Sequence, residues 1–208
     1  MSDLDYFTLF SLPQHLHIDL AALEKTFYAQ SRKLHPDRFA SRPPEEQQAA
    51  LAASSRLNDA YRTLRDPILR TEYLLSLQGI QLQEQSRAAT DAARAAGTEK
   101  KQVAPPDLLE EAFELNMALE ELKMSGDDPD ARAQLESSRT RFTAMLSQTQ
   151  QELEALWTAW DNALDAANPA AQQASTQAMV ALLNRRSYIR NLVRDVSAAL
   201  DAHTAPEG

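Results

Sequence analysis

The chain of 208 residues contains no cysteine and only 4 glycines, and aromatic residues make up only 6% of it. The lack of cysteine excludes disulfides, thiolate metal sites, cysteine-ligated iron–sulfur clusters and cysteine nucleophiles, and it fits a reducing compartment. The scarcity of glycine, together with abundant Ala, Leu, Gln and Glu, disfavours a sheet. The composition therefore predicts an all-α protein.

Long apolar runs are also missing, because no segment approaches the roughly 20 apolar residues of a membrane span. The acidic start, Met1-Ser2-Asp3-Leu4-Asp5, resembles neither a secretory signal nor an Arg-rich transit peptide, so we expect a cytoplasmic protein without membrane contact. The net charge of -9 is concentrated in residues 103–208, which hold 8 Lys and Arg against 17 Asp and Glu. Such acidity argues against nucleic acid as a partner, because phosphate binding requires cations.

The first strong helical pattern ends at a proline. Its larger apolar residues recur on one stripe of a 3.6-residue helix: Leu20, Leu23, Phe27 and Leu34. Asp19 precedes the stripe as a candidate N-cap, and the helix must end near His35 because Pro36 disfavours the α conformation before it. A second helix starts at Pro43-Pro44-Glu45-Glu46 and runs to Asp66-Pro67. The two patterns predict a helical hairpin.

The loop of this hairpin carries His35-Pro36-Asp37, where a simple turn needs only Gly, Asn or Ser. Pro36 restrains the backbone, and Asp37 offers a carboxylate for a charge-assisted bond with a partner's arginine. The residues by themselves leave three interpretations open: a solvated loop, a protein contact and a catalytic pair. Catalysis would need a nucleophile and an orienting group around His35, and the neighbouring sequence supplies neither.

Several stretches in about the first 76 residues resemble a J-domain: Asp5-Tyr6-Phe7, Lys25, Phe27, His35-Pro36-Asp37 and Leu57-Asn58-Asp59-Ala60-Tyr61-Arg62-Thr63-Leu64. The resemblance implies that His35, Pro36 and Asp37 contact a heat-shock chaperone and stimulate its ATPase. It further implies that the preceding helix presents a basic face to the chaperone through Lys25, Arg32 and Lys33. Tyr28 occupies a position that is often basic in general J-proteins, which points to a specialised chaperone.

The remainder of the chain divides into a linker and a second helical domain. Residues 79–104 are dominated by small and polar residues, and we interpret them as a linker between a J-domain at 1–78 and a domain at 105–204. That domain has breaks at Ser125-Gly126-Asp127-Asp128-Pro129 and at Asn168-Pro169. Three helices separated by short breaks predict a three-helix bundle.

The first bundle helix, from Asp107 to about Met124, has two apolar stripes. Leu108, Ala112, Leu115, Leu119 and Leu122 form one stripe. Leu109, Phe113 and Met117 form another, centred about 140° away by the ~100° step of a helix. Glu110, Glu114 and Glu121 flank the second stripe, and Glu120 lies at its edge. The pattern fits both a bundle that buries the two stripes and an exposed docking patch rimmed by carboxylates.

A narrower resemblance links the two domains. Tyr6-Phe7-Thr8-Leu9-Phe10, His35-Pro36-Asp37-Arg38-Phe39-Ala40 and Thr71-Glu72-Tyr73-Leu74-Leu75 are similar to the HscB family, J-type co-chaperones of iron–sulfur cluster assembly. That family joins a J-domain to a three-helix bundle and lacks the Gly/Phe-rich and zinc-finger regions of general J-proteins. The resemblance implies an HscA-type heat-shock chaperone ATPase and an IscU-type iron–sulfur scaffold protein as partners, with no cofactor and no catalysis by this chain.

By the same resemblance, the scaffold binds the first bundle helix, with help from an aromatic residue on the last one. The matching positions are Leu109, Phe113, Glu114, Glu121 and Tyr188. Glu110 and Met117 depart from the family's pattern, so their part in docking is left open. We expect Trp157 and Trp160 to be core or groove residues and the protein to be a monomer. The alternatives are a J-protein for another client, a helical enzyme using His35 and Asp37, and a purely structural helical protein.

Overall fold

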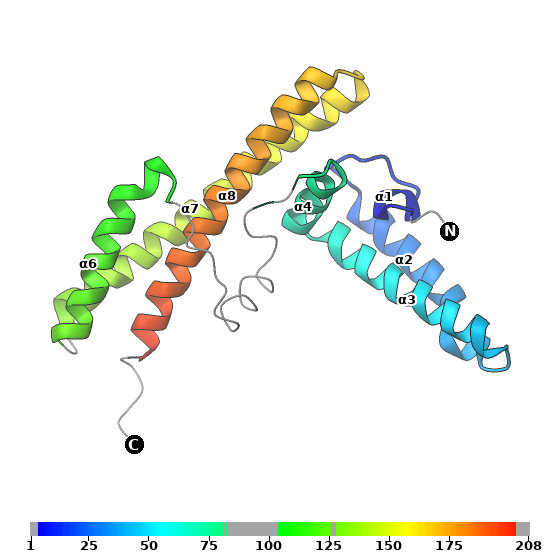
Figure 1. Ribbon diagram of the computed structural model, residues 1–208, viewed down its shortest axis with the longest axis horizontal. Helices are drawn as coiled ribbons and strands as arrows, with labels where there is room; N and C mark the ends of the chain where they lie inside the picture. The colour runs from blue at the N-terminus through cyan, green and yellow to red at the C-terminus, as the bar shows by residue number, and fades with distance from the viewer. Residues whose placement is uncertain (1–3, 81, 83–103, 126–127, 203–208) are drawn as a thin grey trace. The chain divides into compact units, whose positions relative to one another are not determined.

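The computed structural model describes residues 4–80, 82, 104–125 and 128–202 (Figure 1). Every regular element in these ranges is a helix, which confirms the all-α prediction. The elements are α1 (Tyr6–Leu9), α2 (Leu20–Leu34), η1 (Pro36–Phe39), α3 (Pro44–Arg65), α4 (Pro67–Leu77), η2 (Pro106–Leu108), α6 (Leu109–Ser125), α7 (Pro129–Asp165) and α8 (Pro169–Ala202), with η denoting a 3-10 helix.

The helices belong to two compact units. One unit combines residues 1–81 with 157–176, and the other combines residues 82–156 with 177–208. Helices α7 and α8 therefore contribute to both units, a sharing that the sequence pattern does not reveal. The predicted boundaries at 78 and 104 stay predictions, and residues 81 and 83–103 of the predicted linker lie outside the described residues. Within the described ranges, no helix is long and apolar enough to cross a membrane.

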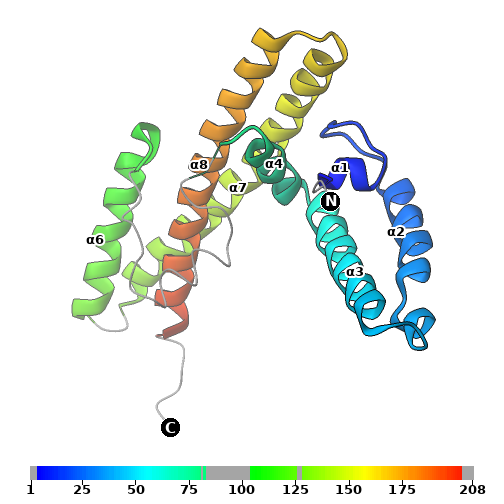
Figure 2. The same ribbon diagram turned by 45° about the vertical axis from the view of Figure 1, so that its right-hand side comes forward.

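Helices α2 and α3 form the predicted hairpin and lie side by side, joined through η1 (Figure 2). Asp19 caps α2 by accepting hydrogen bonds from the backbone N–H groups of Ala21 and Ala22. Leu23 is buried, whereas Leu20, the first residue of the helix, is 52% exposed although it continues the apolar stripe. The core of this unit contains the large side chains Phe7, Phe10, Leu16, Leu23, Leu57, Leu64, Leu74 and Leu75.

The end of α7 and the start of α8 complete the first unit. The indole Nε1 of Trp160 donates to the carbonyl of Gln14 at 3.0 Å. The Asp161 carboxylate accepts from the backbone N–H groups of Leu16, at 2.7 Å, and His17, at 3.0 Å. Trp160 is 3% exposed and Trp157 is 4% exposed, which confirms the expectation that both tryptophans are core or groove residues.

The second unit is built around α6 and the parts of α7 and α8 that pack with it. The first apolar stripe, which begins at Leu108 at the end of η2 and continues along α6, is turned inward, with Leu108, Ala112, Leu115 and Leu122 buried and Leu119 partly buried. Side chains of α7 and α8 complete the core: Ala131, Leu135, Phe142, Ile189, Leu192, Val196 and Leu200. Since this core is filled by one stripe of α6, the other stripe is left at the surface.

Candidate functional site

The His35-Pro36-Asp37 triplet forms an exposed corner between α2 and η1, which we call the α2–η1 corner. The side chains of His35 and Asp37 are 57% and 88% exposed. Nδ1 of His35 accepts a hydrogen bond from the backbone N–H of Asp37 at 3.3 Å and lies 3.4 Å from Oδ2 of Asp37. Because its side chain is 88% exposed, the Asp37 carboxylate is accessible to a partner.

The helix that leads to this corner carries the predicted basic face. Lys25, Arg32 and Lys33 are all exposed on α2. Within the part of the chain that the structure describes, none of the three forms an ion pair. Arg32 and Lys33 lie in the last turn of the helix, where positive charge is favoured by the helix dipole. The charges are thus available to an acidic partner.

The geometry gives the catalytic alternative no support. Among the described residues, the polar partner of the His35 ring is its neighbour Asp37, and no nucleophile or third group orients the ring. The described ranges also contain no cluster of three or more His, Cys, Asp or Glu side chains able to hold a metal ion. The α2–η1 corner is therefore an exposed turn whose described polar contacts are local.

The second apolar stripe of α6 is exposed, so the bundle does not bury both stripes. Leu109 is 55% exposed, Phe113 is 65% and Met117 is 58%. By contrast, Leu108, next to Leu109 in the sequence, is 1% exposed. Met124 lies about two helical turns beyond Met117 on the same face. We call Leu109, Phe113, Met117 and Met124 the α6 patch. Met124 is 87% exposed.

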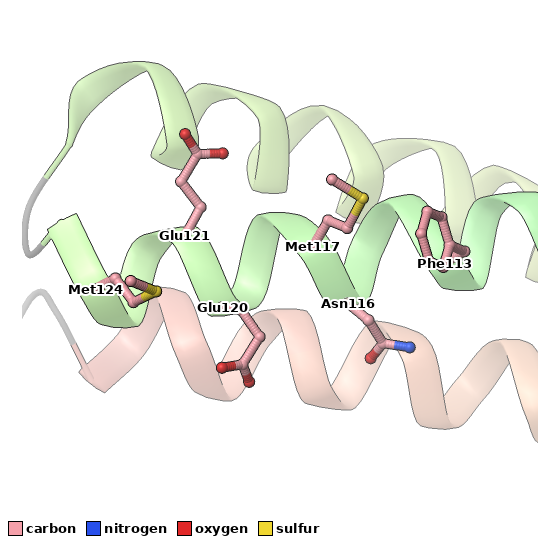
Figure 3. Close-up of a pocket in the computed structure, with 6 residues that line it drawn as sticks. All are labelled: Phe113, Asn116, Met117, Glu120, Glu121 and Met124. Carbon is pink, nitrogen blue, oxygen red and sulfur yellow. The ribbon is translucent and has the colours of Figure 1, made fainter.

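A shallow open groove runs along this face of α6, and Figure 3 shows the side chains that line it. Phe113 and Met124 lie along its middle, Met117 and Glu121 lie to one side, and Asn116 and Glu120 lie to the other. Asn116 and Met124 were not predicted from the sequence. Met124 follows Met117 by seven residues, so extending the second stripe by two turns would have found it.

The predicted carboxylates beside the α6 patch are exposed, and Glu114 among them forms an ion pair. Glu110, Glu114 and Glu121 are exposed. Oε2 of Glu114 lies 3.7 Å from a guanidinium nitrogen of Arg141 on α7, and this ion pair is itself open to solvent. An exposed pair of this kind contributes little stability, so Glu114 can exchange its partner at low cost.

Tyr188 on α8, the predicted aromatic contact, is half-buried and packs against the bundle core. Burial raises the pKa of its hydroxyl. Tyr188 is not among the side chains that line the groove of Figure 3, whereas Phe113 and Glu121 are. Its role in docking therefore stays a prediction.

Comparison with known proteins extends these observations. No protein-family model matches this chain. The chain is 28% identical to the chaperone HscB from Vibrio cholerae, with a TM-score of 0.59 over 96% of this chain and 99% of that one. It also shares the fold of the human co-chaperone protein HscB, at 23% identity and a TM-score of 0.58, over 95% of this chain and 83% of that one. The chain therefore has the HscB fold over nearly its whole length, and its predicted resemblance to the HscB family is confirmed.

Proposed function

We propose that this protein is an adapter in iron–sulfur cluster assembly that has no catalytic activity of its own. Its α2–η1 corner recruits an HscA-type heat-shock chaperone and stimulates the ATPase of that chaperone. Its α6 patch binds the IscU-type scaffold protein on which clusters are built. The adapter presents the scaffold to the chaperone at the moment when ATP is hydrolysed.

Support for the chaperone contact comes from the exposed Asp37 carboxylate and the three cations on α2 that have no ion-pair partner in the described residues. Charge-assisted hydrogen bonds are about twice as strong as neutral ones, so one carboxylate at a fixed corner is an effective anchor. The flanking cations would steer an acidic surface towards it.

The single observation that carries the proposal is the exposure of Leu109, Phe113 and Met117 on one face of α6. Three large apolar side chains in one strip, with carboxylates beside them, form the kind of patch that monomeric proteins expose for a partner. The rim of Glu110, Glu114 and Glu121 would select a client that offers cations around an apolar strip.

Joining the two contacts in one chain explains why neither needs to be strong. When the scaffold is held on the bundle, its encounter with the chaperone becomes an event within one complex. Tethering of this kind raises effective concentration to the millimolar range for short connections. The expected behaviour is a stimulation of ATP turnover that is larger when adapter and scaffold are both present than the sum of their separate effects.

The test measures ATP turnover by the HscA-type chaperone with and without the IscU-type scaffold, in the presence of wild type or Asp37→Asn. Wild type is expected to stimulate turnover, and Asp37→Asn is expected to lose the stimulation while it still binds the scaffold. Glu46→Gln, at an exposed carboxylate on α3, is the matched control and keeps the stimulation. Unchanged stimulation by Asp37→Asn would refute the adapter mechanism.

The alternative is a J-type co-chaperone for another client, and the α6 patch distinguishes the two. A wild-type protein that stimulates the chaperone but does not bind the scaffold would favour the alternative. ATP turnover by the purified protein without any chaperone would instead favour an enzyme.

A further inference from the structure

Tyr28 is an exposed aromatic residue in the middle of the basic face of α2. Its side chain is 55% exposed. Lys25 lies three residues before it and Arg32 lies four residues after it, so the three side chains share one strip of the helix surface. We call Lys25, Tyr28 and Arg32 the α2 strip.

The ring of Tyr28 rests on a fixed row of aromatic groups. It lies 5.4 Å from the ring of Phe27, and Phe27 is stacked on Tyr61 of α3 at 4.2 Å with an interplanar angle of 13°. The guanidinium of Arg65 lies 5.5 Å from the centre of the Tyr61 ring. Since its neighbour is held between α2 and α3, Tyr28 is supported on one side and exposed on the other. A supported aromatic side chain loses little conformational entropy when it binds.

The charges of α2 indicate the chemistry of the surface that would cover Tyr28. The helix carries three cations and one carboxylate, Glu24, and Lys25 and Arg32 form no ion pair with any described residue. A partner must therefore be acidic to cover this face without repulsion. Tyrosine and arginine, with tryptophan, are also the residues most enriched among those that dominate protein interfaces.

We infer that the α2 strip is a specificity contact in which Tyr28 fills an apolar depression flanked by carboxylates on the ATPase of the chaperone. This inference rests on the proposed function, because Arg32 lies three residues before His35 and joins the strip to the α2–η1 corner. Lys25 and Arg32 pair with the two carboxylates, and the phenol ring is buried between them. A chaperone that offers carboxylates without the depression is bound less well.

The test titrates the full chain into the HscA-type chaperone and measures the concentration that gives half-maximal stimulation of ATP turnover. Removal of a dominant interface side chain raises that concentration about fivefold or more, which is the effect expected for Tyr28→Ala. Tyr28→Lys is expected to be equally impaired because it adds charge without filling the depression, whereas Tyr28→Phe stays within about twofold of wild type, since it keeps the ring. Leu51→Ala, at an α3 side chain that is 62% exposed, is the matched control and has no effect.

Different outcomes overturn different claims. If Tyr28→Lys stimulates as well as wild type, the strip recognises charge alone and the role of the aromatic ring is wrong. If Asp37→Asn abolishes stimulation while Tyr28→Ala matches wild type, the adapter mechanism stands and only the α2 strip fails. If wild type does not stimulate the chaperone at all, both proposals fall.

Discussion

The indole Nε1 of Trp157 on α7 donates a buried hydrogen bond of 2.9 Å to the hydroxyl oxygen of Thr71 on α4. The guanidinium of Arg70 lies 4.9 Å from the centre of the Trp157 ring, and its Nη1 donates to the carbonyl of Leu64 at 2.6 Å. Burial lowers the pKa of Arg70, and the charges of Asp66 and Asp161 oppose this shift. The N-terminal helices thus depend for their stability on side chains that arrive from α7.

We expect Thr71→Val to destabilise the protein although it keeps the shape of the side chain. The substitution leaves the Trp157 N–H buried without a partner, which costs about 1–3 kcal/mol in the free energy of unfolding. Urea denaturation measures this change. Thr140→Val, at an exposed α7 threonine whose hydroxyl bonds to a helix carbonyl, is the control and is expected to cost much less. Equal effects of the two substitutions would show that the link between α4 and α7 adds no stability.

Leu108→Ala and Leu109→Ala are expected to change the stability of the protein to very different extents although the residues are neighbours. Leu108 is 1% exposed in the bundle core, and truncation of a buried leucine costs about 2–5 kcal/mol. Leu109 is 55% exposed, and a substitution at such a surface site stays within about 0.5 kcal/mol. The midpoint of thermal unfolding reports the difference. A large loss of stability for Leu109→Ala would mean that the α6 patch is structural.

Scaffold binding is expected to require the apolar part of the α6 patch. Leu109→Ala combined with Phe113→Ala removes two exposed side chains, each of which can contribute more than about 1 kcal/mol if it lies at the centre of the interface. We expect at least a tenfold weaker affinity for the IscU-type scaffold by calorimetry, by the ~1.4 kcal/mol that corresponds to each factor of ten. Leu51→Ala combined with Leu77→Ala removes two exposed leucines elsewhere and should bind normally. If both double variants bind equally well, the scaffold uses another surface.

Two tyrosines should make the protein less stable at alkaline pH. Burial raises the pKa of Tyr188. Burial also raises the pKa of Tyr73, with a contribution from Asp5, while a hydrogen bond from the Tyr6 amide and the charge of Arg56 act in the other direction. The folded state therefore holds these protons more tightly than the unfolded chain does.

Because the unfolded chain loses its tyrosine protons first, this contribution to stability is complete below about pH 10 and is lost as pH rises through the folded-state values. The urea midpoint at about pH 8 and about pH 10.5 should therefore differ more for wild type than for Tyr188→Phe combined with Tyr73→Phe. An alkaline loss that is unchanged in this double variant would contradict the assignment.

Much of the helical architecture follows from local signals in the sequence. Asp19 just before α2, Pro36 after its end and the prolines at the starts of α3 and α4 set helix limits through effects confined to a few residues. The 3-10 turn at Pro36–Phe39 was expected only as a loop. The periodicity of α6 separated its two apolar stripes, but the pattern of one helix does not reveal how many other helices pack against it.

The sequence by itself determined that this protein is all-α, that a proline corner carries His35 and Asp37, and that α6 has two apolar faces, because each depends on residues within a few turns of one another. Only the tertiary structure decided which face of α6 stays exposed, that Trp157 pairs with Thr71, and that Asp161 pairs with Leu16. Those outcomes depend on contacts between segments far apart in the chain, such as Leu16 and Asp161, which are 145 residues apart, and no local pattern encodes the energies of such contacts.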